Sequence, residues 1–206
     1  MSATSTVNTA YVPNAGLTPS NVDGDGIRCP YHAWRFGPDG KCDDIPYHTG
    51  PIPAAACVKS WTVVESLGAV WVWHDPEGGD PEWAHPSLPQ WDDSSWVRGH
   101  WDHLGVLNQH PQEVIDNICD YAHLSPIHGS TVDRYENEFK GHTATQRQCG
   151  GHRTLTAADG SGAVLHTDTT YHGPGVLISY LTGMFETVLL IMHTPVDDGS
   201  IKVWHS

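Results

Sequence analysis

The chain has 206 residues, of which 24 are acidic and 10 are basic, and its formal net charge is −14 at pH 7. This acidic surplus argues against nucleic acid and against anionic membrane surfaces, because both attract proteins through Lys and Arg. The sequence also has no apolar run long enough to cross a bilayer, so we expect no membrane span.

The start of the chain and its cysteines indicate a cytoplasmic protein. Residues 1–20 have neither a charged start nor an apolar stretch, so they do not form a secretory signal. The 5 cysteines include no Cys-x-x-Cys pair, which argues against a disulfide framework and against a four-cysteine zinc site. Because Thr, Ser, Asn, Gly and Pro dominate residues 1–21, we expect a disordered or non-native leader there.

Short strands separated by turns are predicted in the first half of the chain. Aromatic and β-branched residues alternate on both sides of Ser66-Leu67-Gly68, which is the pattern of a β-hairpin. Residues 74–95 are rich in Pro, Gly, Asp and Trp without a period, which indicates a linker between domains. The predicted strand segments are residues 27–28, 33–36, 61–65 and 69–73.

A helix is predicted from Pro111 to near Leu124. The missing N–H of proline is harmless at the first helical position, and the residue before Pro126 avoids the helical conformation. An apolar face at helical spacing runs between these limits, formed by Val114, Ile115, Ile118, Cys119 and Ala122.

The last third of the chain is predicted to form strands again. They alternate only partly between apolar and polar residues, as expected for a sheet that covers a helix or a pocket with one face. The predicted strands are residues 163–171, 176–182, 186–194 and 201–204, and the predicted turns are 159–160, 173–175 and 198–199.

The first chemical motif is Cys29-Pro30-Tyr31-His32, which lies between two predicted strands. In a Rieske [2Fe–2S] cluster two Cys hold one iron and two His hold the other, which raises the reduction potential. A lone Cys-x-x-His is more often a buried thiol beside a turn histidine. Here the motif continues into a longer pattern, Trp34-Arg35-Phe36, Gly40-Lys41-Cys42 and Ile45-Pro46-Tyr47.

The second motif is Asn117-x-x-Asp120-x-x-His123-x-x-x-x-His128. Positions 117, 120 and 123 share one face of a helix, and past Pro126 the chain can fold back to bring His128 beside His123. Two histidines and a carboxylate on one side of Fe(II) leave open positions for O₂ and substrate. In a chain with 15 histidines, a single His pair at this spacing can also be incidental.

The two motifs, in this order, resemble those of the terminal oxygenase component of Rieske non-haem iron oxygenases, and the pattern around Cys42 resembles the 3-ketosteroid 9α-hydroxylase branch. The resemblance implies Cys29 and His32 as [2Fe–2S] ligands. It implies two mononuclear iron ligands, a carboxylate that links the first of them to a neighbouring subunit's cluster histidine, and an amide behind the ligands. The implied iron ligands are His123 and His128. The linking carboxylate is Asp120, and the amide is Asn117.

Two parts of the family pattern do not occur in this sequence. The first cluster loop should be a Cys-x-His upstream of Cys29, but residues 1–28 contain neither Cys nor His. The third iron ligand should be an Asp far toward the C-terminus, and we do not assign that role to Asp197 or Asp198. We therefore expect a Rieske domain that is incomplete at its N-terminus and a catalytic domain that is truncated at its C-terminus.

The resemblance also implies the fold and the assembly. Its fold class is α+β, with an all-β Rieske domain followed by an α+β helix-grip catalytic domain. In this chain we expect the partial Rieske domain at residues 22–85 and the partial mononuclear-iron domain at residues 96–206. A homotrimer is implied, because each cluster serves the iron of the neighbouring subunit.

The implied activity is that of an oxidoreductase that hydroxylates a small hydrophobic ring, steroid or aromatic, as a mono- or dioxygenase. O₂ would be the co-substrate, and NAD(P)H electrons would arrive through a separate ferredoxin or flavin reductase, because the sequence has no nucleotide-binding glycine loop. Two alternatives remain open. One is a non-catalytic fragment or pseudo-enzyme of the family, and the other is a simple metal-binding module.

Overall fold

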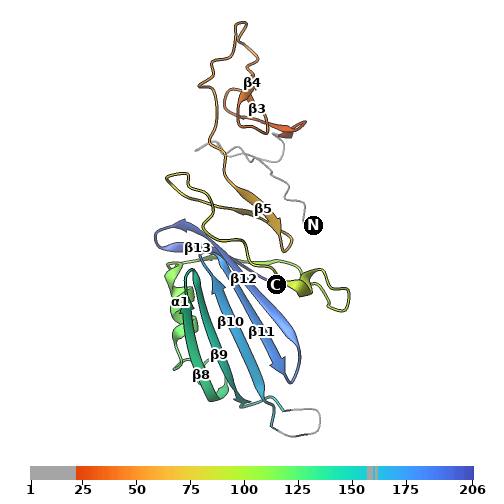
Figure 1. Ribbon diagram of the computed structural model, residues 1–206, viewed down its shortest axis with the longest axis vertical. Helices are drawn as coiled ribbons and strands as arrows, with labels where there is room; N and C mark the ends of the chain where they lie inside the picture. Colours follow the sequence, from red (N-terminus) through yellow and green to blue (C-terminus); the bar gives the residue numbers. More distant parts are fainter. Residues whose placement is uncertain (1–21, 157–159, 161) are drawn as a thin grey trace. The chain divides into compact units, whose positions relative to one another are not determined.

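The computed structural model describes residues 22–156, 160 and 162–206 (Figure 1). The predicted leader, residues 1–21, lies outside the described residues, as does Asp159 of the predicted turn. The chain divides into two compact units, Met1–Trp91 and Asp92–Ser206. Within the part that is described, no helix is long and apolar enough to cross a membrane.

The first unit begins with a four-stranded antiparallel sheet in the order β1-β2-β3-β4. The strands are β1 Val22–Asp23, β2 Gly26–Arg28, β3 Arg35–Phe36 and β4 Cys42–Asp44. Phe36, Cys42 and Ile45 form its small buried core together with Cys29. The strand predicted at 33–36 is shorter than expected, because Ala33 has a positive φ of 60° and belongs to the connecting loop.

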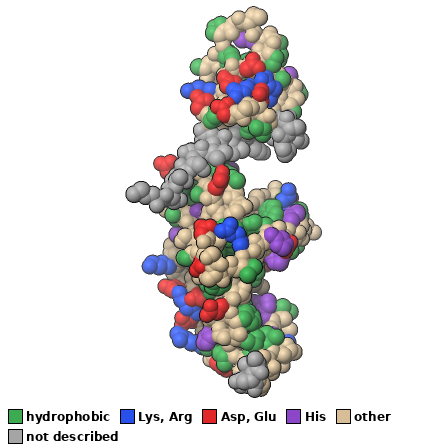
Figure 2. All heavy atoms as spheres, turned by 90° about the vertical axis from the view of Figure 1, so that its right-hand side faces the viewer, with side chains coloured by type: hydrophobic (Ala, Val, Ile, Leu, Met, Phe, Trp, Pro, Cys, Tyr) green, Lys and Arg blue, Asp and Glu red, His purple; other side chains and the backbone are tan. Residues whose placement is uncertain are grey.

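The side chain of Arg28 connects several strands of this sheet through hydrogen bonds. Arg28 donates to Asp23 at 2.7 Å, to Asp44 at 2.8 Å and to the Ala33 carbonyl at 2.7 Å. Figure 2 shows acidic and basic side chains intermixed over these strands. Exposed ion pairs of this kind add little stability. The bond to Ala33 nevertheless holds the end of the loop that carries Cys29 and His32.

A β-hairpin and a short helical turn complete the first unit. The hairpin pairs β5 Val63–Ser66 with β6 Ala69–Val72, as the sequence predicts. Leu67 and Gly68 connect the strands with φ angles of 53° and 70°, and two positive φ values in a two-residue loop match the right-handed twist of a hairpin. The segment predicted as a linker contains the 3-10 helix η2, Pro89–Trp91.

The second unit is built on a seven-stranded antiparallel sheet in the order β7-β13-β12-β11-β10-β9-β8. The strands are β7 Asp102–Leu107, β8 Ser130–Lys140, β9 Thr143–His152, β10 Leu165–His172, β11 Val176–Gly183, β12 Thr187–Asp197 and β13 Ser200–His205. The last four confirm the predicted strands to within a few residues. Strands β7, β8 and β9 were not predicted from the sequence.

One helix of this unit, α1 (Gln112–Cys119), packs against the sheet beside β8 and β9 (Figure 1). Ile118 lies in one buried cluster with Ala144, Tyr171 and Leu177 from three neighbouring strands. The predicted helix end near Leu124 is wrong, because the helix stops at Cys119. Asp120 is extended, with ψ of 102°, and residues 121–128 form turns.

Tyr171 of this cluster forms a buried hydrogen bond with His193. The Tyr171 hydroxyl accepts a hydrogen bond from the Gly175 N–H at 3.1 Å and lies 2.9 Å from Nε2 of His193. Nδ1 of His193 is buried and has no hydrogen-bond partner among the described residues, so Nε2 makes the ring's contact with the hydroxyl. Burial lowers the pKa of His193 and raises that of Tyr171, so both are neutral at pH 7.

The pair makes folding sensitive to acid. Because the folded pKa of His193 is depressed, the unfolded chain binds a proton that the folded chain refuses, so stability falls as the pH drops below the unfolded value of about 6.5. His193→Gln should flatten this fall between about pH 5 and 7 in urea unfolding. Part of the slope should remain, since the pKa values of His128 and His172 are lowered too. An unchanged slope would contradict this assignment, and the exposed His100→Gln is the control.

Gly150 is required by close packing between β8 and β9. A Cβ at this position would lie 1.7 Å from the Thr131 carbonyl oxygen, next to the bulge between Val132 and Arg134. Gly150→Ala should therefore lower the free energy of unfolding by roughly 1–3 kcal/mol. Gly162→Ala is the matched control, because its Cβ would meet no atom within 4 Å. Equal unfolding midpoints for the two variants would show that the strands can separate without cost.

Candidate functional site

The loop between β2 and β3 holds the first predicted pair of ligands. The Cys29 N–H donates to the Trp34 carbonyl at 2.8 Å, and the Ala33 N–H donates to the Cys29 carbonyl at 2.9 Å, which closes the loop. Cys29 is 9% exposed, whereas the His32 ring is exposed and lies edge-on against Tyr31 at 3.9 Å. The loop thus offers a buried sulfur and an accessible imidazole.

Neighbouring groups do not complete this pair. The Cys42 thiol donates to the Asp44 carbonyl at 3.5 Å, and burial raises its pKa. Cys42 belongs to the same buried core as Cys29. A ring nitrogen of His48 is within 3.2 Å of the Pro51 carbonyl, and Cys57 is exposed.

The second predicted pair lies just after α1. The rings of His123 and His128 are 5.0 Å apart, at an angle of 71°. Between them the Ile127 N–H donates to the His123 carbonyl at 2.9 Å, and the Ser130 N–H donates to the Leu124 carbonyl at 3.1 Å. These turns around Pro126 fold the chain back, so the structure brings both histidines together as the spacing predicts.

Asp120 fixes the tautomer of His123. Nδ1 of His123 is 2.7 Å from the Asp120 carbonyl oxygen and 3.4 Å from its carboxylate. A carbonyl only accepts hydrogen bonds, so Nδ1 carries the proton and Nε2 presents its lone pair. Metal-binding histidines are usually held in this way, with the second ring nitrogen donating to a carbonyl or carboxylate.

Asn117 and Asp120 do not share a helix face with His123, contrary to the sequence-based expectation, because α1 ends before Asp120. Asp120 reaches His123 through a turn in which its carboxylate accepts the Ala122 N–H at 2.8 Å. The Asn117 carbonyl accepts the Asp120 N–H at 3.3 Å, and the Asn117 side chain is exposed. Asp120 thus contacts His123 through a turn, and the predicted role of Asn117 stays a prediction.

Electrostatics also favour a metal at this pair. Burial lowers the pKa of His128, and the neighbouring His123 lowers it further. A neutral imidazole is the form that binds metal ions, so His128 needs no deprotonation at pH 7. A ring separation of 5.0 Å also lets both rings meet one ion when each metal–nitrogen bond is about 2 Å long.

Cys29 with His32, and His123 with His128, each supply part of the ligands that a metal group needs. In the ranges that the structure describes, no group of three or more His, Cys, Asp or Glu is arranged to hold a metal ion. Cys29 and His32 therefore match one of the two loops of a Rieske cluster. His123 and His128 match two ligands of a mononuclear centre.

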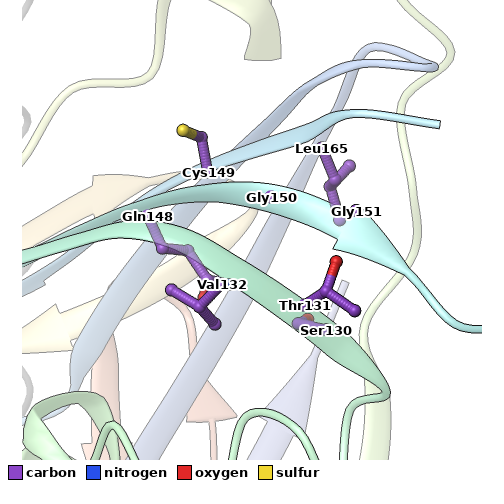
Figure 3. A pocket seen from close by; sticks show the side chains of 8 residues that line it. All are labelled: Ser130, Thr131, Val132, Gln148, Cys149, Gly150, Gly151 and Leu165. Carbon is purple, nitrogen blue, oxygen red and sulfur yellow. The ribbon is translucent and has the colours of Figure 1, made fainter. Parts of the chain in front are cut away.

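A small cavity lies beside the bulge between Val132 and Arg134, where β8 pairs with β9 (Figure 3). Its volume of about 10 Å³ holds roughly one water molecule, so it is too small for a ring substrate. The buried Gln148 side-chain oxygen has no hydrogen-bond partner among the described residues, and a water in the cavity would satisfy it. The lining residues are Ser130, Thr131, Val132, Gln148, Cys149, Gly150, Gly151 and Leu165.

One residue near the site was not found by sequence reasoning. The Tyr135 hydroxyl, on β8, donates to the Ile118 carbonyl at 2.9 Å, at the end of α1. The two residues are 17 positions apart, so no local spacing links them. The contact could have been expected only if β8 had been predicted and placed beside α1.

Two family models match this chain. Residues 72–206 match the model described as 3-Ketosteroid 9alpha-hydroxylase C-terminal domain. Residues 13–62 match the Rieske [2Fe-2S] domain. The first match includes the segment from Asn117 to His128, and the second includes Cys29 and His32.

Relatives and a solved structure show similarity over different lengths. An oxygenase component of 3-ketosteroid-9-alpha-monooxygenase from Rhodococcus rhodochrous is 35% identical over 92% of this chain and 52% of its own length. A cholesterol 7-desaturase from Hemicentrotus pulcherrimus is 38% identical over 59% of this chain and 27% of its own. Dicamba monooxygenase bound to 3,6 dichlorosalicylic acid has a TM-score of 0.68 at 20% identity, over 89% of this chain and 60% of that one, which shows a shared fold. The chain spans about half the length of the Rhodococcus relative.

The histidine pair predicts a simple binding experiment. His123→Ala and His128→Ala should each weaken Co(II) binding by at least about 10-fold in a spectroscopic titration, because each removes one of two imidazole ligands. His100→Ala, whose ring is exposed and faces Asp102, is the matched control and should bind as the unmodified chain does. Equal affinities in all three variants would place the metal elsewhere.

Proposed function

This chain belongs to the 3-ketosteroid 9α-hydroxylase family of Rieske oxygenases, and from this membership we propose that it is part of the oxygenase component of an enzyme that hydroxylates a steroid or sterol ring. The matches confirm the predicted family and the predicted fold class, a Rieske domain followed by an α+β domain. The cofactors of this family are a [2Fe–2S] cluster and Fe(II).

The observation that carries the proposal is the arrangement of His123, whose Nδ1 proton is held by the Asp120 carbonyl at 2.7 Å while Nε2 stays available. His123 and His128 would hold the iron, which supplies O₂ activation when it is bound. The chain's own contribution is to keep the proton on Nδ1 of His123 and to keep His128 neutral. Cys29 and His32 would each hold one side of the cluster.

The substrate class is supported by the relatives. One is named for a 3-ketosteroid and another for cholesterol, and both names denote the same fused-ring skeleton. Steroid or sterol hydroxylation is therefore the proposal, with aromatic acids as the less supported substrates. The wider assembly belongs to the proposal too: a separate reductase that delivers NAD(P)H electrons, a homotrimer, and the domain bounds 22–85 and 96–206. In such a trimer the half-exposed Asp120 carboxylate would face a neighbouring cluster histidine.

A second candidate is a non-catalytic relative that binds a single divalent metal. It is favoured by the donor sets, because no three potential metal ligands converge in the described ranges. The two candidates differ in sulfide. A Rieske centre contains acid-labile sulfide, whereas a metal held by His123 and His128 does not.

Anaerobic reconstitution with iron and sulfide tests the proposal. A protein that contains iron and acid-labile sulfide with a Rieske-type visible spectrum would support the proposal, and would mean that further ligands complete the set begun by Cys29 and His32. Cys29→Ser should abolish that spectrum, because it removes a thiolate ligand. Cys57→Ser is the matched control, since Cys57 is exposed and lies outside the loop. One iron without sulfide would support the second candidate, and a protein without bound iron would contradict both.

A further inference from the structure

We propose that Tyr135 is a positioning residue, whose hydroxyl ends α1 at Cys119 and thereby sets the tautomer of His123. The inference rests on the proposed function, in which His123 binds iron. Tyr135 lies on β8 and acts through the backbone of residues 118–122.

The Tyr135 hydroxyl is held in one orientation. The Asn137 side-chain amide donates to it at 3.1 Å, and the hydroxyl itself donates to the Ile118 carbonyl at 2.9 Å. The half-buried ring lies edge-on against Tyr121 at 5.3 Å. Because the oxygen accepts from Asn137, its own proton is available for the helix carbonyl.

The hydrogen bonds change after Cys119, where the Asp120 N–H donates to the Asn117 carbonyl at 3.3 Å, three residues earlier. If α1 continued, the Ala122 N–H would donate to the Ile118 carbonyl, four residues earlier. In the structure both groups have another partner. The Tyr135 hydroxyl donates to the Ile118 carbonyl and competes there with a helical N–H, and the Asp120 carboxylate accepts the Ala122 N–H at 2.8 Å.

The early end of the helix is what lets Asp120 serve His123. Asp120 has an extended backbone with ψ of 102°, and its carbonyl accepts the Nδ1–H of His123 at 2.7 Å. In a continued helix that carbonyl would instead point along the axis toward the N–H of Leu124. Loss of the Tyr135 bond frees the Ile118 carbonyl, favours another helical turn, and removes the acceptor that holds the proton on Nδ1.

The first test measures the tautomer in the metal-free protein, where iron plays no part. Two-bond ¹H–¹⁵N correlation spectra, recorded at mildly alkaline pH, should show His123 protonated on Nδ1. Tyr135→Phe should shift the ring to a mixture of tautomers or to Nε2–H. Tyr180→Phe, a half-buried tyrosine on β11, is the matched control and should leave the spectrum unchanged.

The second test measures Co(II) affinity below the melting temperature. Tyr135→Phe should weaken binding by about 10-fold, the range found when residues that orient a metal-binding histidine are removed. The exposed Asn137→Ala, which keeps the fold and the tyrosine, should shift the tautomer and the affinity in the same direction by less. It serves as the second variant if Tyr135→Phe folds poorly.

The outcomes separate this inference from the proposed function. A lower melting temperature with unchanged tautomer and unchanged Co(II) affinity would overturn the inference, because Tyr135 would then only stabilise the fold. A tautomer shift in a protein whose Co(II) binding does not depend on His123 would support the role of Tyr135 and contradict the metal site. Both shifts together would support both proposals.

Discussion

The competition for backbone hydrogen bonds at the end of α1 is the constraint on which the candidate metal centre depends. A helix continues only while each N–H finds the carbonyl four residues earlier. Here the Tyr135 hydroxyl competes for the Ile118 carbonyl, and the Asp120 carboxylate accepts the Ala122 N–H. The chain therefore leaves the helix one turn before His123, and a carbonyl that would otherwise lie in the helix becomes the acceptor for an imidazole proton.

The seven-stranded sheet positions both groups that meet at the end of α1, the Ile118 carbonyl and the Tyr135 hydroxyl. Ile118 is anchored in a buried cluster with Ala144, Tyr171 and Leu177, which sets the position of α1 on the sheet. Tyr135 comes from the edge strand β8, whose register is set by pairing with β9. Apolar packing thus positions the helix, and one polar contact from the sheet decides where it ends.

The loop of Cys29 and His32 is also held by a combination of backbone and side-chain contacts. Two backbone hydrogen bonds close the loop, and the Arg28 guanidinium holds it from outside through the Ala33 carbonyl. The sulfur is buried in the small core while the imidazole is exposed. A buried sulfur beside an accessible imidazole suits the proposed role of this loop in holding a cluster, and the segment lies within the match to the Rieske [2Fe-2S] domain.

The sequence by itself determined the features that depend on neighbours along the chain. The hairpin at Leu67-Gly68 follows from local alternation and turn residues, and the pairing of His123 with His128 follows from their spacing around Pro126. Strands β8 and β9 were not predicted, because apolar and polar residues do not alternate along their charged and glycine-containing sequences. Their pairing with each other defines them as strands. Only the tertiary structure decided where α1 ends and which His123 nitrogen carries the proton. The physical reason is that the deciding hydroxyl comes from a strand 17 residues beyond the carbonyl it binds, a contact that no helical period encodes.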